Sequence, residues 1–181
     1  MQPCVKSVQN YLTLKQNRKP LILSICLGIL DNVLKSHIRS QNYEDFVILE
    51  NILEIDLHPT YFYERFYYAG QELGRHTDRP ACEISVTLQI STNLKEPWDI
   101  WFQKPDGKET SIKMKSGDAV IYKGCEREHW RLPMKSNYNK LQNKFRTFRK
   151  KEDDTYLHQI FFHYVDAQGP YVHYAYDAIK S

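Results

Sequence analysis

Hydrophobic residues recur every three or four positions between residues 27 and 40, which is the spacing of side chains along one face of an α-helix. Mostly polar residues fill the positions between them. We therefore predict an amphipathic helix over 27–40 whose apolar face supports the rest of the domain. The residues of this face are Leu27, Leu30, Val33, Leu34 and Ile38.

The apolar segment over residues 21–30 does not predict a membrane anchor. It is shorter than the roughly 20 residues that a helix needs to cross a bilayer. It also starts well after Met1 and is followed by Asp31, whereas a secretory signal ends in small residues before its cleavage site. We interpret the segment as a buried helix or strand and expect no contact with a membrane.

Farther along the chain the apolar period changes to two, which is the period of a β-strand. Ile84, Val86, Leu88 and Ile90 alternate with polar residues, and this pattern predicts a half-buried strand. Aromatic residues are dense over 61–68 and also favour a strand, which residues 69–70 (AG) close in a turn.

Turn residues divide the second half of the chain. The sequences PDG at 105–107 and GD at 117–118 favour tight turns. Short apolar runs around these turns have the length and composition of strands. The strands predicted in this way cover residues 100–103, 112–115, 120–122, 129–132 and 157–165.

Composition adds that the chain forms one domain. It has 181 residues, 41% of them hydrophobic and 13% aromatic, and shows no repeat or linker. Its net charge of +3 is too small to indicate a nucleic-acid partner by itself. The cysteines have neither close pairing nor zinc-type spacing, which predicts a reducing compartment such as the cytoplasm. They are Cys4, Cys26, Cys82 and Cys125.

Two histidines and one aspartate offer ligands for a metal ion. His76 and Asp78 are two positions apart, so on a strand their side chains would point to the same face. His129 follows much later, and a second strand beside the first would bring it to the same ion. Such a set holds Fe(II) in oxygenases and leaves the opposite side open. An exposed turn at 76–78 and an ordinary strand-edge histidine at 129 are the structural alternatives.

Several short segments carry a resemblance to a known family. They are PTY at 59–61, YYAGQ at 67–71, HTDRP at 76–80, CEISVT at 82–87, GDAVIY at 117–122, EHWR at 128–131 and HYVD at 163–166. Together they resemble the 2-oxoglutarate/Fe(II)-dependent oxygenases. Within that superfamily the chain is most similar to uncharacterised microbial and viral members of the prolyl-4-hydroxylase-like branch. The resemblance covers roughly residues 55–175.

The resemblance implies a mainly β fold with flanking helices, a double-stranded β-helix barrel of the jelly-roll or cupin type. It implies a single domain over 1–181, with helical support over 1–58 and the barrel core over 59–175. It also implies that Fe(II) is bound by His76, Asp78 and His129. The cosubstrates would be 2-oxoglutarate and O₂, and hydroxylation of a substrate C–H group would release succinate and CO₂.

The far carboxylate of 2-oxoglutarate needs buried donors, preferably a cation. Related enzymes place Arg or Lys on the last strand two positions before a serine, where this chain has Leu157 and Gln159. We therefore assign the carboxylate to Arg131, which shares its side of a strand with His129. As an alternative, Arg131 forms a structural ion pair. The carboxylates considered for that pair are Glu126, Glu128 and Asp118.

Two further side chains could reach the cosubstrate. Tyr67 matches a first-strand tyrosine of the superfamily, and Gln159 could add another hydrogen bond. His158 and His163 are interpreted as packed or hydrogen-bonded core residues, because the three assigned ligands suffice for one iron. Cys82 and Cys125 are interpreted as small buried residues without a catalytic role.

The substrate does not follow from the fold. A peptide or protein side chain is our first hypothesis, with residues 171–176 as candidate walls, and a free amino acid or small metabolite is the second. The third is nucleic-acid demethylation. In that case the basic residues within 135–151 would hold phosphates, and Tyr138, Phe145 and Phe148 would stack on bases. Such a run is also typical of a solvated face.

A hypothesis of a different class is a non-catalytic barrel. In it the same His and Asp side chains hold zinc or no metal, and the protein acts as a binding module. Metal content and Fe(II)-dependent binding of 2-oxoglutarate distinguish the two classes.

Overall fold

The structure is a computed structural model that describes residues 46–139, 141–142, 144 and 153–177. The predicted helix over 27–40, the apolar segment over 21–30, Cys4 and Cys26 lie outside the described residues. So does most of the basic part of the 135–151 run. The predictions for these segments, and the division at residue 58, therefore stay predictions.

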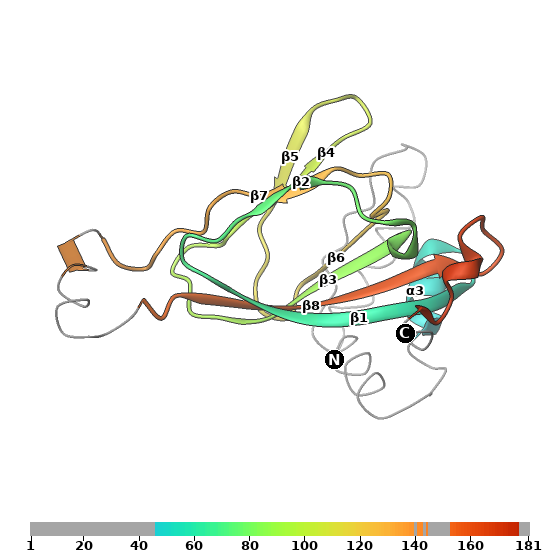
Figure 1. The fold of residues 1–181 in the computed structure, drawn as a ribbon, viewed down its shortest axis with the longest axis horizontal. Helices are drawn as coiled ribbons and strands as arrows, with labels where there is room; N and C mark the ends of the chain where they lie inside the picture. Colours follow the sequence, from blue (N-terminus) through green and yellow to red (C-terminus); the bar gives the residue numbers. More distant parts are fainter. Residues whose placement is uncertain (1–45, 140, 143, 145–152, 178–181) are drawn as a thin grey trace, which may run out of the picture.

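Two antiparallel four-stranded sheets form the described part of the chain, which is mainly β with little helix (Figure 1). The first sheet contains, in spatial order, β1 (Leu57–Tyr68), β8 (Tyr156–Asp166), β3 (Ile84–Thr92) and β6 (Ala119–Tyr122). The second contains β2 (Leu73–His76), β7 (His129–Arg131), β4 (Ile100–Gln103) and β5 (Glu109–Ile112). The helical elements whose bounds are fully described are α3 (Phe46–Leu53) and the 3₁₀ turns η2 (Pro80–Cys82) and η3 (Val172–Tyr174).

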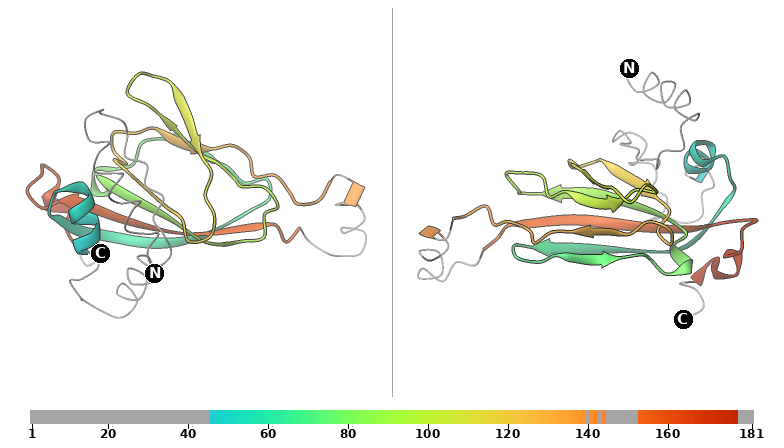
Figure 2. Two further views of the ribbon diagram at one scale, coloured as in Figure 1. Left: turned by 180° about the vertical axis from the view of Figure 1, so that it is seen from behind. Right: turned by 90° about the horizontal axis from the view of Figure 1, so that it is seen from above.

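The strands that pair are often distant in sequence. β1 and β8 run side by side along the long axis of the molecule, as two further views show (Figure 2). The predicted turns are confirmed, since Gly70, Gly107 and Gly117 all have positive φ angles. The second strand of the 105–107 hairpin was placed too late, because β5 covers Glu109–Ile112.

The prediction that β3 is half-buried was wrong. Its first six residues are all buried, including Ser85, Thr87 and Gln89. The apolar face packs in a cluster with α3. On the polar face, Ser85 Oγ donates to Asp78 Oδ2, and Thr87 Oγ1 lies 3.3 Å from Tyr122 Oη. Alternation in this strand therefore separates two buried environments rather than core from solvent.

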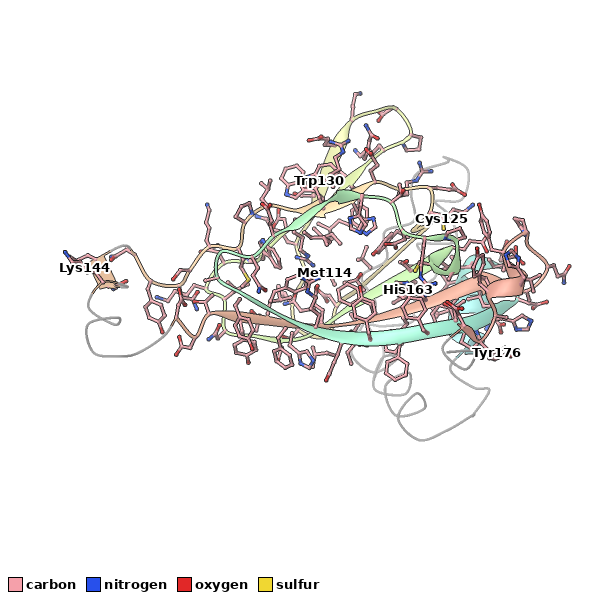
Figure 3. The ribbon with its side chains drawn as sticks, viewed as in Figure 1. Met114, Cys125, Trp130, Lys144, His163 and Tyr176 are labelled. Atoms are coloured by element: carbon pink, nitrogen blue, oxygen red, sulfur yellow. The ribbon has the colours of Figure 1, made fainter. Side chains whose placement is uncertain are left out.

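The largest apolar cluster lies on the α3 side of the first sheet. Leu88 is 1% exposed and packs there with residues of β6, β8 and α3. Two smaller clusters fill the space between the sheets, where Met114 and His163 are seen in Figure 3. Within the described residues, no helix is long and apolar enough to cross a membrane.

Leu88→Ala is expected to destabilise the protein by about 2–5 kcal/mol, because it removes buried methyl groups and leaves a cavity. Denaturant unfolding measures this loss. Leu132→Ala is the matched control, since Leu132 is 55% exposed and its truncation should change the free energy of unfolding little. Equal losses for both variants would contradict the placement of Leu88 in the core.

Candidate metal centre

The second sheet places two imidazoles side by side. β2 pairs with β7 so that His76 is opposite His129, and their ring centroids lie 4.3 Å apart. The sequence-based prediction that a second strand would bring His129 beside His76 is confirmed. Residue numbers alone could not give this register, because the two strands are joined by a long connection through β3 to β6.

Asp78 reaches the histidines from outside the strand. The prediction that His76 and Asp78 share one strand face was wrong, because β2 ends at His76. The backbone N–H of Asp78 donates to Gly124 O at 2.9 Å, and Ser85 Oγ donates to Asp78 Oδ2 at 2.8 Å. Asp78 is thus fixed by hydrogen bonds to the loop after β6 and to β3, rather than by strand geometry.

The three candidate ligands converge. Asp78 Oδ1 lies 3.5 Å from His76 Nε2 and 3.6 Å from His129 Nε2. One ligand atom from each of the three residues lies within 4.8 Å of the other two. Two imidazoles and one carboxylate in this arrangement can bind a divalent first-row metal such as Fe(II).

Backbone carbonyls orient both rings. His76 Nδ1 lies 2.7 Å from Gly74 O, and His129 Nδ1 lies 2.9 Å from Arg127 O. A carbonyl only accepts, so each Nδ1 carries the proton and each Nε2 presents its lone pair toward Asp78. Burial lowers the pKa of His129, which favours the neutral form that a metal needs.

Three residues that support this centre were missed in the sequence. Ser85 and Gly124 hold Asp78, and Tyr122 Oη lies 3.4 Å from His129 Nε2. Ser85 belonged to the supposedly exposed face of β3. The only sequence signal for the role of Ser85 was its position in an alternating strand close to the candidate ligand Asp78.

Gly124→Ala is expected to disturb the centre, because a Cβ there would overlap Asp78 Oδ2, Ser85 Oγ and the Cys82 carbonyl oxygen. Overpacking of this kind costs about 1–3 kcal/mol, and here it should also displace Asp78. Thermal unfolding and Fe(II) content after anaerobic reconstitution measure the two effects. Gly74→Ala is the control, since a Cβ at Gly74 has nothing within 4 Å. Unchanged iron content in Gly124→Ala would contradict this account of Asp78.

Arg131 is a buried cation. It is 2% exposed, its guanidinium donates to Trp98 O, and it lies 4.7 Å from the Trp98 ring centroid. Within the described residues no carboxylate forms an ion pair with it. Burial lowers the pKa of Arg131 to about 10, which leaves it charged at neutral pH.

The carboxylates proposed as alternative partners of Arg131 are engaged elsewhere. Glu128 pairs with Arg75 at 2.8 Å, and Glu126 pairs with Lys123 at 3.0 Å. Asp118 accepts a hydrogen bond from the backbone of Lys115. The structure therefore offers no support for a structural ion pair at Arg131.

Gln159 and Tyr67 are buried on the inner side of the first sheet. Gln159 is fully buried, and neither atom of its amide has a hydrogen-bond partner within the described residues. Tyr67 is 1% exposed and packs edge-on against Trp98, with ring centroids 5.1 Å apart. A buried cation with no ion pair within the described residues and an amide with no hydrogen-bond partner there could both donate to a buried carboxylate, such as the far end of a 2-oxo acid.

The other two histidines and two cysteines considered as site candidates lie in three different surroundings. His158 stacks on Phe66, on the side of β8 that faces away from the second sheet. His163 and the buried Cys82 lie beside Asp78. Cys125, which was expected to be buried, is partly exposed and donates to Arg79 O.

Comparison with family models and with curated proteins finds no match to this sequence. Solved structures do match. A Pseudomonas putida prolyl-4-hydroxylase has a TM-score of 0.53 at 12% identity, over 92% of this chain and 96% of that one. An oxidoreductase of the 2OG-Fe(II) oxygenase family from Burkholderia pseudomallei has a TM-score of 0.52 at 10% identity, over 80% and 65% of the two chains. The structural neighbours are 2-oxoglutarate/Fe(II) oxygenases.

A third neighbour is the non-heme α-ketoglutarate-dependent epimerase SnoN from nogalamycin biosynthesis, with a TM-score of 0.51 at 9% identity. It is covered over 74% of its length. The chain spans about half of the non-heme monooxygenase ThoJ and 65% of the Burkholderia chain, but nearly all of the Pseudomonas one. At these identities the likeness shows the fold.

Proposed function

We propose that this chain is an Fe(II)- and 2-oxoglutarate-dependent dioxygenase with a jelly-roll barrel, which hydroxylates a peptide side chain or a free amino acid. The observation that carries the proposal is the convergence of His76, Asp78 and His129 near a buried, unpaired Arg131. The group of three ligands and the buried arginine each have another explanation when considered separately. Together they match a metal and a cosubstrate that carries a carboxylate.

When bound, Fe(II) and 2-oxoglutarate supply the oxidation, in which O₂ is consumed, succinate and CO₂ leave, and a substrate C–H group becomes hydroxylated. The chain's own residues position these groups. His76, Asp78 and His129 would hold the metal, and Arg131 with Gln159 would orient the cosubstrate. Burial raises the pKa of Tyr67, so its hydroxyl stays protonated and can donate a hydrogen bond.

A peptide or amino-acid substrate is supported by two observations. The prolyl-4-hydroxylase neighbour aligns over 92% of this chain and 96% of its own. In addition, Tyr61 and Tyr63 stack near His163 beside the centre, and Tyr63 is 42% exposed. These rings offer an apolar surface on which a side chain could be held with its C–H group toward the metal.

Anaerobic titration of the Fe(II)-reconstituted protein with 2-oxoglutarate tests the proposal. A weak visible charge-transfer band is expected as the 2-oxo acid chelates iron, and His76→Ala should not show it. Succinate release in the presence of peptides or amino acids then identifies the substrate. Absence of the band, with zinc retained after purification, would contradict the proposal and favour a binding module.

A further inference from the structure

A second group of metal-binding side chains lies next to the first. Asp78, Cys82 and His163 each offer a ligand atom, and these atoms all lie within 4.8 Å of one another. The residues come from the segment after β2, from η2 and from β8. Figure 3 shows His163 on the inner side of β8, between the two sheets. The proposed oxygenase reaction assigns no role to Cys82 or His163.

Both new side chains are buried and held in place. Cys82 is 2% exposed, and its Sγ lies 3.0 Å from Tyr61 Oη. His163 is 3% exposed and its ring packs 4.7 Å from the Tyr61 ring. A thiol, an imidazole and a carboxylate so confined lose little conformational freedom on binding an ion, which favours coordination.

Hydrogen bonding leaves His163 with unused capacity. The Ser85 hydroxyl donates to Asp78 Oδ2, so His163 Nδ1, at 3.1 Å from Ser85 Oγ, is the donor in that second contact. His163 Nε2 then carries a lone pair, and it has no partner within the described residues. A buried ring nitrogen without a partner is unfavourable, and coordination of an ion through Nε2 would relieve this cost.

We propose that Asp78, Cys82 and His163 form a second metal site that binds Zn²⁺ or a similar ion and takes Asp78 away from the iron centre. A thiolate with an imidazole and a carboxylate is a donor set suited to Zn²⁺, whereas Fe(II) in oxygenases uses imidazole and carboxylate alone. Binding converts the Cys82 thiol to a thiolate and releases its proton to solvent. The Tyr61 hydroxyl is placed to donate a hydrogen bond to that sulfur.

Sharing of Asp78 gives the second site a regulatory consequence. Its carboxylate is the only acidic member of both groups. An ion held with Cys82 and His163 would therefore compete for one of the three protein ligands of the iron centre. This consequence rests on the proposed function, whereas the existence of the second site does not.

The first test uses Co²⁺ as a spectroscopic substitute for Zn²⁺ in the His76→Ala/His129→Ala variant, which lacks the first site. A cobalt–thiolate charge-transfer band is expected at one ion per chain, and excess Zn²⁺ should remove it. Adding Cys82→Ser should abolish the band, and adding His163→Gln should weaken Co²⁺ binding at least tenfold. Cys125→Ser is the matched control and should keep the band.

Absence of a cobalt–thiolate band, or a band that persists in Cys82→Ser, would overturn the second site. Loss of the band in Cys125→Ser would overturn the assignment of the sulfur ligand. Circular dichroism confirms that each variant is folded, and Cys82→Ala replaces Cys82→Ser if the serine variant does not fold. This test uses neither iron nor 2-oxoglutarate, so its outcome is independent of the oxygenase proposal.

The second test measures competition in the otherwise unchanged protein. Zn²⁺ should suppress the visible band of the Fe(II)–2-oxoglutarate complex, and Cys82→Ser should require at least tenfold more Zn²⁺ for the same suppression. Equal Zn²⁺ requirements in the two proteins would overturn the proposed competition for Asp78, even where the first test supports the second site.

Discussion

Asp78→Ala is expected to abolish stoichiometric Fe(II) binding. Asp78 supplies the only carboxylate among the three converging ligands, and two imidazoles alone leave the dication without a charged partner. Loss of one of three protein ligands should weaken iron binding by at least 100-fold, or about 2.7 kcal/mol. Iron content after anaerobic reconstitution and desalting measures the change.

Asp106→Ala provides the matched control for this variant. Asp106 lies in the turn between β4 and β5, where it accepts a hydrogen bond from the backbone of Lys108. Its removal should leave iron content at the level of the unchanged protein. Full iron occupancy in Asp78→Ala would remove Asp78 from the centre and, with it, the proposed mode of iron binding.

Arg131→Met is expected to weaken the binding of 2-oxoglutarate without lowering the thermal stability of the protein. Methionine has a similar length without charge, so the variant removes a buried cation that has no ion-pair partner within the described residues. Thermal stability without ligand should therefore be kept or increased. Affinity for 2-oxoglutarate should fall by tens- to a hundredfold, on the order of 2–3 kcal/mol, because a buried charge-assisted interaction is lost.

Calorimetric titration of the Fe(II)-loaded variants measures the affinity. Arg65→Met is the matched control, since Arg65 is exposed and its guanidinium lies 4.4 Å from the Tyr67 ring centroid in the same region. Iron content should be normal in both variants. Unchanged affinity in Arg131→Met together with a large loss in Arg65→Met would assign the cosubstrate carboxylate to Arg65 instead.

The sequence predicted the positions of the strands better than the burial of the side chains on them. Alternation in 84–90 and the aromatic run in 61–68 correctly indicated β3 and much of β1. The same alternation could not show that Ser85, Thr87 and Gln89 are buried, because a polar period of two has the same form for solvent and for a polar interior. α3 lies within residues 1–58, for which the resemblance implied helical support, but its bounds were not predicted, since a short apolar run suits a helix or a strand equally well.

The sequence predicted which residues form the centre, but not the contacts that hold these residues in position. The pairing of His76 with His129 follows from the strand order, which the sequence suggested through family resemblance. The position of Asp78 depends on two hydrogen bonds, one with Ser85 seven residues later and one with Gly124 in the loop after β6. Both contacts join segments that no single helix or strand pattern relates, so neither supporting residue was identified beforehand.

The hydrogen bond from Ser85 to Asp78 also links β3 of the first sheet to the segment that follows β2 of the second sheet, whose strands carry His76 and His129. A metal bound by all three ligands would crosslink the second sheet to the segment that Ser85 of the first sheet holds in place. Metal loading would then resist separation of the sheets, by about 2.7 kcal/mol when free metal is 100-fold above its dissociation constant. Without metal, the two sheets should separate locally more often near β2 and β7. Addition of metal is therefore expected to slow amide hydrogen exchange in these two strands.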